Sequence, residues 1–214
     1  MKKALASGFV AVVFLCCFQI EQARALGMGL YVEGATGGAT FSGNGNNDRD
    51  TDTDQHIGFG LNLDTAVAKD KLFNYRLKLG YESVDFGWDV GTVTAGWDCH
   101  SFVLDNTFGF AVLKRPVTRL WLGPQIRLAS LNGTGKTSGN DLNGGGIGLG
   151  LVLGANFHVG PVVSLGLEAG YREMFYFIDL PDSNNNGFNT ILDGHFFCAL
   201  SVLFRMGDMY HGEE

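Results

Sequence analysis

The histidines of this chain, with nearby carboxylates and serines, are its best-suited residues for general acid-base chemistry. The candidates are His56, His100, His158 and His195. Asp193 precedes His195 by two residues, and in a strand this spacing puts both side chains on one face, as in a base and its orienting carboxylate. Ser183 and Ser201 lie in the same stretch, but neither stands at a defined offset from a histidine. Because a histidine on the polar face of a strand usually only forms hydrogen bonds, we predict no catalytic site.

A second group of residues has the spacing of a calcium-binding loop. Oxygen ligands recur in Asp182-x-Asn184-x-Asn186-Gly187, and Asp193 supplies the acid at the twelfth position. The acidic stretch 48–54 is similar but lacks the glycine. A polar hairpin rich in Asn, Asp and Gly needs no metal to explain it. We therefore assign no resident metal, and the candidate calcium ligands are Asp182, Asn184, Asn186 and Asp193.

Residues 133–137, Gly-Thr-Gly-Lys-Thr, match part of a phosphate-binding loop. The complete motif requires a glycine where Ser130 stands, and a helix directly after the Lys-Thr pair. Here a glycine-rich segment leads into a strand pattern instead. We predict no nucleotide site and no cofactor.

The elements that carry these residues are predicted by a hydrophobic period of two. In the stretch 145–177 the odd positions from Ile147 to Val159 are apolar, while most even positions are small or polar. After Gly160-Pro161 the alternation resumes, with Leu165 and Leu167 against Gly166 and Glu168. This period indicates two extended strands with one apolar face each, joined as an antiparallel hairpin.

The same alternation recurs along the chain and predicts eight strands. Besides the two arms of that hairpin, the segments are 27–41, 57–67, 72–85, 99–113, 118–131 and 190–206. Long connections at 42–55, 86–98, 132–144 and 179–189 alternate with short ones at 69–71, 114–117 and 160–161. Outer-membrane barrels have long extracellular loops and short periplasmic turns. We therefore expect an all-β, eight-stranded antiparallel up-and-down transmembrane β-barrel; the alternative is an exported soluble barrel or sandwich.

The N-terminal residues predict export. Lys2 and Lys3 precede an apolar run at 4–18 and the small-x-small sequence Ala23-Arg24-Ala25, the pattern of a Sec-type signal peptide. We expect residues 1–25 to be a cleaved signal peptide, 26–206 the barrel, and 207–214 a short polar tail.

Net charge limits the classes of partner, and the positions of the cysteines indicate whether a disulfide forms. The net charge of −7 disfavours a nucleic-acid partner. Cys16 and Cys17 belong to the predicted signal peptide. Of the remaining two cysteines, Cys99 lies near a loop and Cys198 in the middle of a strand, so we predict two free thiols rather than a disulfide.

If the apolar positions face lipid, the other face of each strand points into the barrel. An eight-stranded barrel encloses only enough space for side chains, and unpaired charges there would be costly. Acids and bases match in number on this inward face, which predicts a plugged lumen held by ion pairs. This lumen charge network comprises Glu33, Asp64, Glu82, Asp105, Glu168 and Asp193 with Arg76, Lys78, Arg119, Arg127, Arg172 and Arg205.

With this pattern, residues 26–206 resemble the small eight-stranded outer-membrane barrels of Gram-negative bacteria, the OmpA-, OmpX- and Opa-like group, with OmpW-like barrels as the nearest alternative. The resemblance implies a periplasmic N-terminus and polar loops outside the cell. One departure concerns the end of the chain, because such barrels usually finish on an aromatic residue, whereas Phe204 is followed by a polar tail.

The resulting expectation is a monomeric, non-enzymatic barrel in the outer membrane that acts in envelope structure or in surface binding through acidic Gly/Asn-rich loops. Its expected partners are outer-membrane lipid and lipopolysaccharide, and the barrel-assembly machinery during biogenesis. One alternative is a narrow OmpW-like channel for small or hydrophobic solutes. The other is a lipid A-modifying enzyme, which the resemblance would require to have a His-Ser-acid group near the outer rim.

Overall fold

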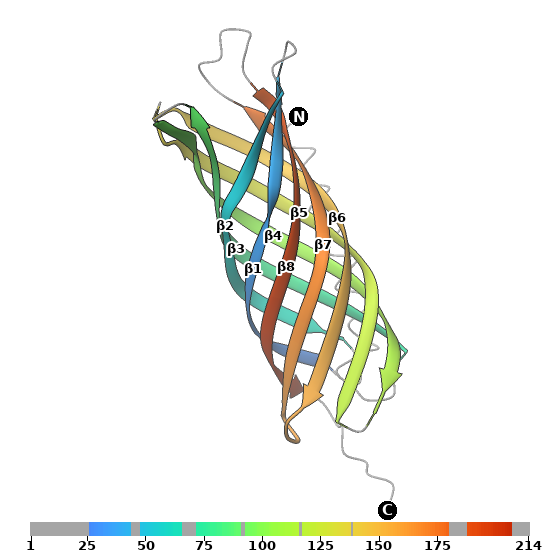
Figure 1. The fold of residues 1–214 in the computed structure, drawn as a ribbon. Helices are drawn as coiled ribbons and strands as arrows, with labels where there is room; N and C mark the ends of the chain where they lie inside the picture. The colour runs from blue at the N-terminus through green and yellow to red at the C-terminus, as the bar shows by residue number, and fades with distance from the viewer. Residues whose placement is uncertain are drawn as a thin grey trace, which may run out of the picture.

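A computed structural model of the chain describes residues 26–43, 48–65, 72–90, 93–115, 117–137, 139–179 and 188–206. These residues form a closed barrel of eight strands (Figure 1). The strands are β1 (Leu26–Gly43), β2 (Arg49–Asp64), β3 (Phe73–Val90), β4 (Val93–Lys114), β5 (Thr118–Gly135), β6 (Asp141–His158), β7 (Val163–Asp179) and β8 (Phe188–Met206). The predicted signal peptide, 1–25, and tail, 207–214, lie outside the described residues.

Each strand pairs antiparallel with the next one in the chain, and β8 pairs with β1 along almost its whole length. The predicted all-β, up-and-down topology is therefore confirmed. Closure leaves no strand edge unpaired, which satisfies the backbone hydrogen bonds without water. Among the described residues, no helix is long and apolar enough to cross a membrane.

The connections divide the barrel into two ends. We call the end where β1–β2, β3–β4, β5–β6 and β7–β8 are joined the hairpin end; it is uppermost in Figure 1. At the opposite end, the turn end, β2–β3, β4–β5 and β6–β7 are joined, β1 begins and β8 ends. In the tilted cylinder of Figure 1, β1 and β8 lie side by side and complete the wall.

Strands at the hairpin end are longer than the sequence pattern predicted. Much of the stretches 42–55, 86–98 and 132–144, predicted as loops, is paired strand. The last ladder pairs join Phe41 to Arg49 in β1–β2, and Val90 to Val93 in β3–β4. In β5–β6 the pairing reaches Thr134 and Asp141.

The reason is that the amphipathic pattern inverts along the strands. In β3, the lower outward residue Leu79 is apolar and exposed, while its inward neighbour Lys78 is charged and buried. Further along, outward Ser83 is polar, whereas inward Val84 and Phe86 are buried. A strand that leaves the lipid has water outside, so its polar face turns outward and its apolar face inward.

The inverted segments build a hydrophobic core inside the hairpin end, which we call the hairpin-end core. It consists of Ala39, Phe41, Val84, Phe86, Trp97, Cys99, Leu131, Leu142, Met174, Tyr176, Ile178 and Ile191. Phe41 and Phe86 meet edge to face within it, with ring centroids 5.5 Å apart. A smaller apolar cluster of Trp121, Val152 and Phe197 lies elsewhere in the lumen. Strand parity in a lipid-embedded barrel predicts a polar interior throughout, so the larger cluster differs from the prediction.

Among the described residues, the cysteines are Cys99 and Cys198, and both are free thiols, as predicted. Cys99 is buried in the hairpin-end core, whereas Cys198 is exposed on the outer face of β8. The two thiols therefore lie on opposite faces of the barrel wall, where no disulfide can join them.

Candidate functional site

All of the residues predicted to form the lumen charge network are buried inside the barrel, and they come from every strand except β6. They are Glu33, Asp64, Arg76, Lys78, Glu82, Asp105, Arg119, Arg127, Glu168, Arg172, Asp193 and Arg205. Each stands at an inward position of its strand, because successive side chains alternate between the two faces of the sheet. Burying so many charged groups is tolerable only if they contact groups of opposite sign.

The centre of the network holds two carboxylates among three cations. Glu33 lies 2.8 Å from Lys78 Nζ and 3.1 Å from Arg127 Nη2, and it also pairs with Arg172. Asp105 contacts the same three cations, with distances of 2.5 Å to Arg127 Nε, 3.4 Å to Arg172 and 3.7 Å to Lys78. The positive charges thus bridge the two carboxylates.

Toward the turn end, the network continues through Arg76. Its guanidinium lies 2.5 Å from Asp64, pairs with Glu168 and donates to the Asn156 side chain at 2.8 Å. Lys78 Nζ lies 3.1 Å from Glu168 and so joins this group to the centre. Aromatic faces support the cations as well, since the Arg76 guanidinium stacks 4.9 Å from the Trp121 ring centre.

Arg119 and Arg205 occupy the turn-end portion of the lumen, beyond these pairs. The Arg119 guanidinium donates to the Leu72 carbonyl over 3.4 Å. The backbone N–H of Arg205 donates to the Val162 carbonyl at 2.7 Å. Both side chains are buried, so the network's positive members extend toward the turn end.

Toward the hairpin end, the network includes histidines as well as arginines. Glu82 lies 2.6 Å from Arg127 and 2.7 Å from His56 Nε2. His195 Nδ1 is 3.3 Å from Asp193, and its Nε2 accepts a hydrogen bond of 2.9 Å from Arg172 Nε. The rings of His56 and His195 meet with centroids 4.7 Å apart.

The spacing of Asp193 and His195 predicted that both lie on one face of a strand, but His56 was not predicted to lie beside them. The stretch ending at residue 55 was predicted as a loop, so His56 stood at the edge of its strand with no assigned direction. Since Ile57 points outward and is exposed, strand parity does turn His56 inward. Parity therefore indicates that His56 points inward, although the strand was predicted to begin only at residue 57; it does not indicate which residues His56 meets there.

Of the candidate calcium ligands, the described residues include Asp193 alone. Asp182, Asn184 and Asn186 lie outside the described residues. Asp193 belongs to β8, and its fully buried carboxylate contacts His195 inside the barrel. Asp193 therefore stands at an inward position of β8, and the calcium loop stays a prediction.

No His-Ser pair suited to hydrolysis forms between His195 and Ser201. Both lie in β8, six residues apart by number, which corresponds to roughly 20 Å along an extended strand. Ser183, the other serine considered, lies outside the described residues.

The outer surface of the barrel is apolar over a wide band. Leu30, Leu149 and Phe196 expose 64%, 68% and 66% of their surfaces, and many other large apolar side chains are similarly exposed. Aromatic pairs occur in this surface, including Phe73 with Phe110 and Tyr81 with Phe102. Such a continuous apolar belt with aromatic residues suits acyl chains and their interface rather than water.

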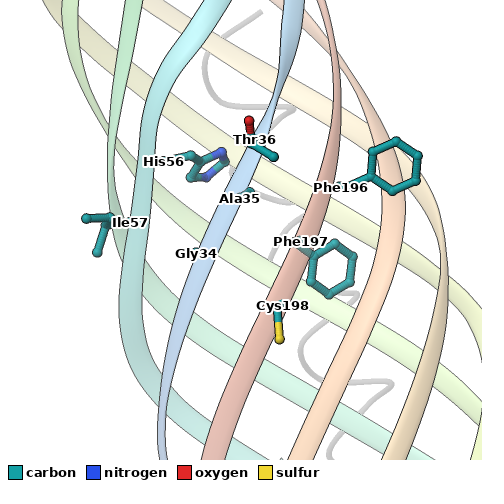
Figure 2. A pocket seen from close by; sticks show the side chains of 8 residues that line it. All are labelled: Gly34, Ala35, Thr36, His56, Ile57, Phe196, Phe197 and Cys198. Carbon is teal, nitrogen blue, oxygen red and sulfur yellow. The ribbon is translucent and has the colours of Figure 1, made fainter.

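A surface pocket interrupts this belt where β2, β1 and β8 run side by side (Figure 2). Its lining residues are Gly34, Ala35, Thr36, His56, Ile57, Phe196, Phe197 and Cys198. Outward Ile57 and Phe196 form its rim, whereas His56 and Phe197 are buried on the inner side of the wall. The β1–β2 register shifts here, between Ala35 and Gly37. The pocket therefore marks a thin, irregular place in the wall.

The family model described as outer membrane protein beta-barrel domain matches residues 9–196. The structure is similar to the outer membrane protein OprG from Pseudomonas aeruginosa, with 11% identity, 84% of this chain and 96% of that chain covered, and a TM-score of 0.54. That likeness concerns the fold.

Two further similar structures are Neisserial surface protein A and the attachment invasion locus protein Ail of Yersinia pestis. The first has 16% identity, covers 82% of this chain and 96% of that chain, and has a TM-score of 0.45. The second has 13% identity, covers 86% of this chain and 100% of that chain, and has a TM-score of 0.44. Among curated proteins, no relative matches the sequence.

Proposed function

The chain belongs to the outer membrane protein beta-barrel family and resides in the Gram-negative outer membrane, and on this premise we propose that it is a closed, non-enzymatic barrel with a plugged lumen. In this role it serves envelope structure, or surface binding through its polar hairpins. The interior stabilises the barrel rather than conducting solutes.

One observation carries this proposal: ion pairs connect opposite walls of the barrel. In a ring of eight strands, β1 lies opposite β5 and β3 lies opposite β7. Glu33 of β1 contacts Arg127 of β5 at 3.1 Å, and Lys78 of β3 contacts Glu168 of β7 at 3.1 Å. Pairs that bridge both diameters leave side chains, not water, across the section of the lumen.

Two further features support a closed barrel that presents its hairpins. The hairpin-end core places large apolar side chains, such as Phe86 and Trp97, across the interior beyond the charge network. Outside, the same hairpins are polar: Lys136 pairs with Asp85 and lies 3.7 Å from Asp98. These ion pairs connect the β5–β6 hairpin to the β3–β4 hairpin, which supports an ordered polar surface beyond the apolar belt.

Conductance in planar lipid bilayers tests the closed lumen. The purified barrel, reconstituted from detergent, is expected to give no steady single-channel steps, because ion pairs and apolar side chains fill its section. Bilayers treated with the same detergent alone provide the control. Resolved steps of one defined size would contradict the proposal and favour a channel.

A second candidate function, a lateral path for a small hydrophobic solute, draws support from the pocket at β1, β2 and β8. There the wall is irregular, and a side chain added at Gly34 would meet little: its Cβ would lie 4.0 Å from the nearest neighbouring atom, the His56 carbonyl oxygen. Gly34→Leu should therefore fill the pocket without a backbone clash. If the pocket binds an apolar fluorescent probe, this variant should weaken binding; Gly160→Leu, in an open turn, should not.

That the protein is not an enzyme is also part of the proposal. The separation of His195 and Ser201 along β8 supports it. Mass spectra of lipid A from cells with and without the protein should be identical. Added or missing acyl chains that depend on the protein would overturn this part.

The proposed partners follow from the surface. Acyl chains and lipopolysaccharide would cover the apolar belt, and the barrel-assembly machinery would insert the chain after export by the signal peptide predicted at residues 1–25. A monomer fits a closed ring with no free edge. No nucleic-acid partner is expected at a net charge of −7.

A further inference from the structure

The structure places two imidazoles and a carboxylate together inside the barrel, where the lumen charge network ends toward the hairpin end. His56, Asp193 and His195 each offer one ligand atom, and these atoms all lie within 4.8 Å of one another. All three side chains are at most 2% exposed. We propose that this His56–Asp193–His195 cluster is a binding site for a divalent first-row transition-metal ion of the zinc type.

The backbone makes room for this cluster in a specific way. His56 comes from β2 and the other two residues from β8, so β1 lies between them. The ladder partners in β1 are Ala35 for His56, Gly37 for His195 and Ala39 for Asp193. A Cβ at Gly37 would fall 2.7 Å from His195 Cβ. Small residues on the inner face of β1 thus let side chains from both flanking strands lean over it and meet.

The tautomer of His56 suits a metal ligand. Its Nε2 lies 2.7 Å from a Glu82 carboxylate oxygen, which assigns the ring proton to Nε2 and leaves a lone pair on Nδ1. His56 Nδ1 has no hydrogen-bond partner among the described residues, although the side chain is buried. A carboxylate that holds the far nitrogen of a ligating histidine is a common second-sphere arrangement at metal sites.

Asp193 and His195 already stand at a ligand spacing. His195 Nδ1 is 3.3 Å from the Asp193 carboxylate. In a tetrahedral site with bonds of about 2.0–2.1 Å, neighbouring ligand atoms lie about 3.3–3.4 Å apart. Two nitrogens and one oxygen suit zinc-type ions better than calcium or magnesium, which prefer oxygen ligands.

Binding requires the ligand atoms, now within 4.8 Å of one another, to close to about 3.3–3.4 Å, and it requires a proton shift at His195. Its Nε2 accepts a hydrogen bond from Arg172 Nε, which puts the ring proton on Nδ1, toward Asp193. For Nδ1 to bind the metal, this proton must move to Nε2, and the hydrogen bond from Arg172 Nε is then broken. Arg172 retains Glu33 and Asp105 as ion-pair partners, so its charge stays compensated.

Cobalt binding by the folded, chelator-treated barrel in detergent tests the proposal. Co²⁺ is expected to bind with one-to-one stoichiometry, to give the visible absorption of a tetrahedral nitrogen–oxygen site, and to be displaced by Zn²⁺. Because this measurement uses the unaltered chain, it does not depend on whether a variant folds. Absence of saturable Co²⁺ and Zn²⁺ binding would overturn the proposal.

Variants locate the site. His56→Gln and His195→Gln should each abolish the cobalt spectrum, and Glu82→Gln should weaken Co²⁺ binding about 10- to 100-fold by releasing the His56 ring. His100→Gln is the matched control, since His100 is exposed on the outer face of β4, and its spectrum should match the unaltered chain. Retention of the spectrum in both cluster histidine variants, or its loss in the control, would refute the assignment.

Discussion

Glu33 illustrates how a single buried acid depends on its neighbours. It contacts Lys78, Arg127 and Arg172, which come from three strands, and it is almost fully buried. A charge in this position would be costly alone, and removing it leaves three cations partly uncompensated. Glu33 therefore stabilises the lumen through its three ion pairs together rather than through any one of them.

We predict that Glu33→Gln lowers the free energy of unfolding by about 3–5 kcal/mol, the range for breaking a buried ion pair from one side. Asp85→Asn, in the partly exposed pair with Lys136, is the matched control and should cost about 0–1 kcal/mol. Urea unfolding of the barrel in lipid vesicles measures both. Equal, small effects would mean that water reaches Glu33.

Gly154 leaves room for a large side chain on the neighbouring strand. It is the ladder partner of Trp121, and a Cβ at Gly154 would enter the Trp121 ring. The ring is fully buried and stacks beside the Arg76 guanidinium. The glycine therefore gives an aromatic side chain its place inside a narrow barrel.

Gly154→Val should destabilise the barrel by about 1–3 kcal/mol, the usual cost of overpacking, because Trp121 must leave its position beside Arg76. Gly160→Val, at a turn where an added Cβ meets nothing within 4 Å, is the control. Urea midpoints and tryptophan fluorescence report the change. An unshifted midpoint in the Gly154 variant would show that the ring has room to move.

At the scale of the strand, β3 passes from lipid to water within a few residues. Leu79 is 52% exposed on the outer face, and four residues later the outward position is Ser83. The inner face changes in the opposite sense, from Lys78 to Val84. The inversion thus marks the membrane edge on this strand.

A charge scan across this edge tests the assignment. Leu79→Arg should cost about 2–4 kcal/mol and Ser83→Arg about 0–1 kcal/mol, because a cation is costly near the bilayer midplane and tolerated near its interface. Unfolding from vesicles measures both. Similar costs at the two positions would place the membrane edge elsewhere.

The inversion also explains how far the sequence could predict these strands. A period of two predicted every strand correctly in the lipid-facing part, where one rule fixes both faces. The stretches 86–98 and 132–144 looked like loops, since their Gly, Asn and Asp residues resemble turn residues. Ladder pairs such as Val90 with Val93 and Thr134 with Asp141 show them as strand, and these pairs depend on contacts across each hairpin.

The candidate site was predictable to the same degree. Strand parity alone predicted that Glu33 and Arg127 lie in the lumen, because it decides which face of a strand a side chain occupies without reference to the residues it contacts. Parity could not say that Arg127 reaches across to β1, since the tilt and stagger of the barrel decide which inward residues meet. For the same reason, nothing in the sequence brings His56 of β2 next to His195 of β8, with β1 between them.

For the whole molecule, the geometry describes a cylinder held from within by charge and at its hairpin end by apolar packing. The outer belt fits lipid, and the polar hairpins extend beyond it. Lys78 and Glu168 come from β3 and β7, on opposite sides of the ring, so their ion pair connects the two walls across the lumen.

A double-mutant cycle on Lys78 and Glu168, read from urea unfolding in vesicles, tests this bracing most directly. Lys78→Met and Glu168→Gln should each destabilise the barrel, but together they should cost less than the sum, with a coupling energy of about 0.5–3 kcal/mol. The exposed pair of Lys136 and Asp98 should show coupling near zero. Strict additivity for Lys78 and Glu168 would mean that the opposite walls do not touch, and would contradict a lumen closed by ion pairs.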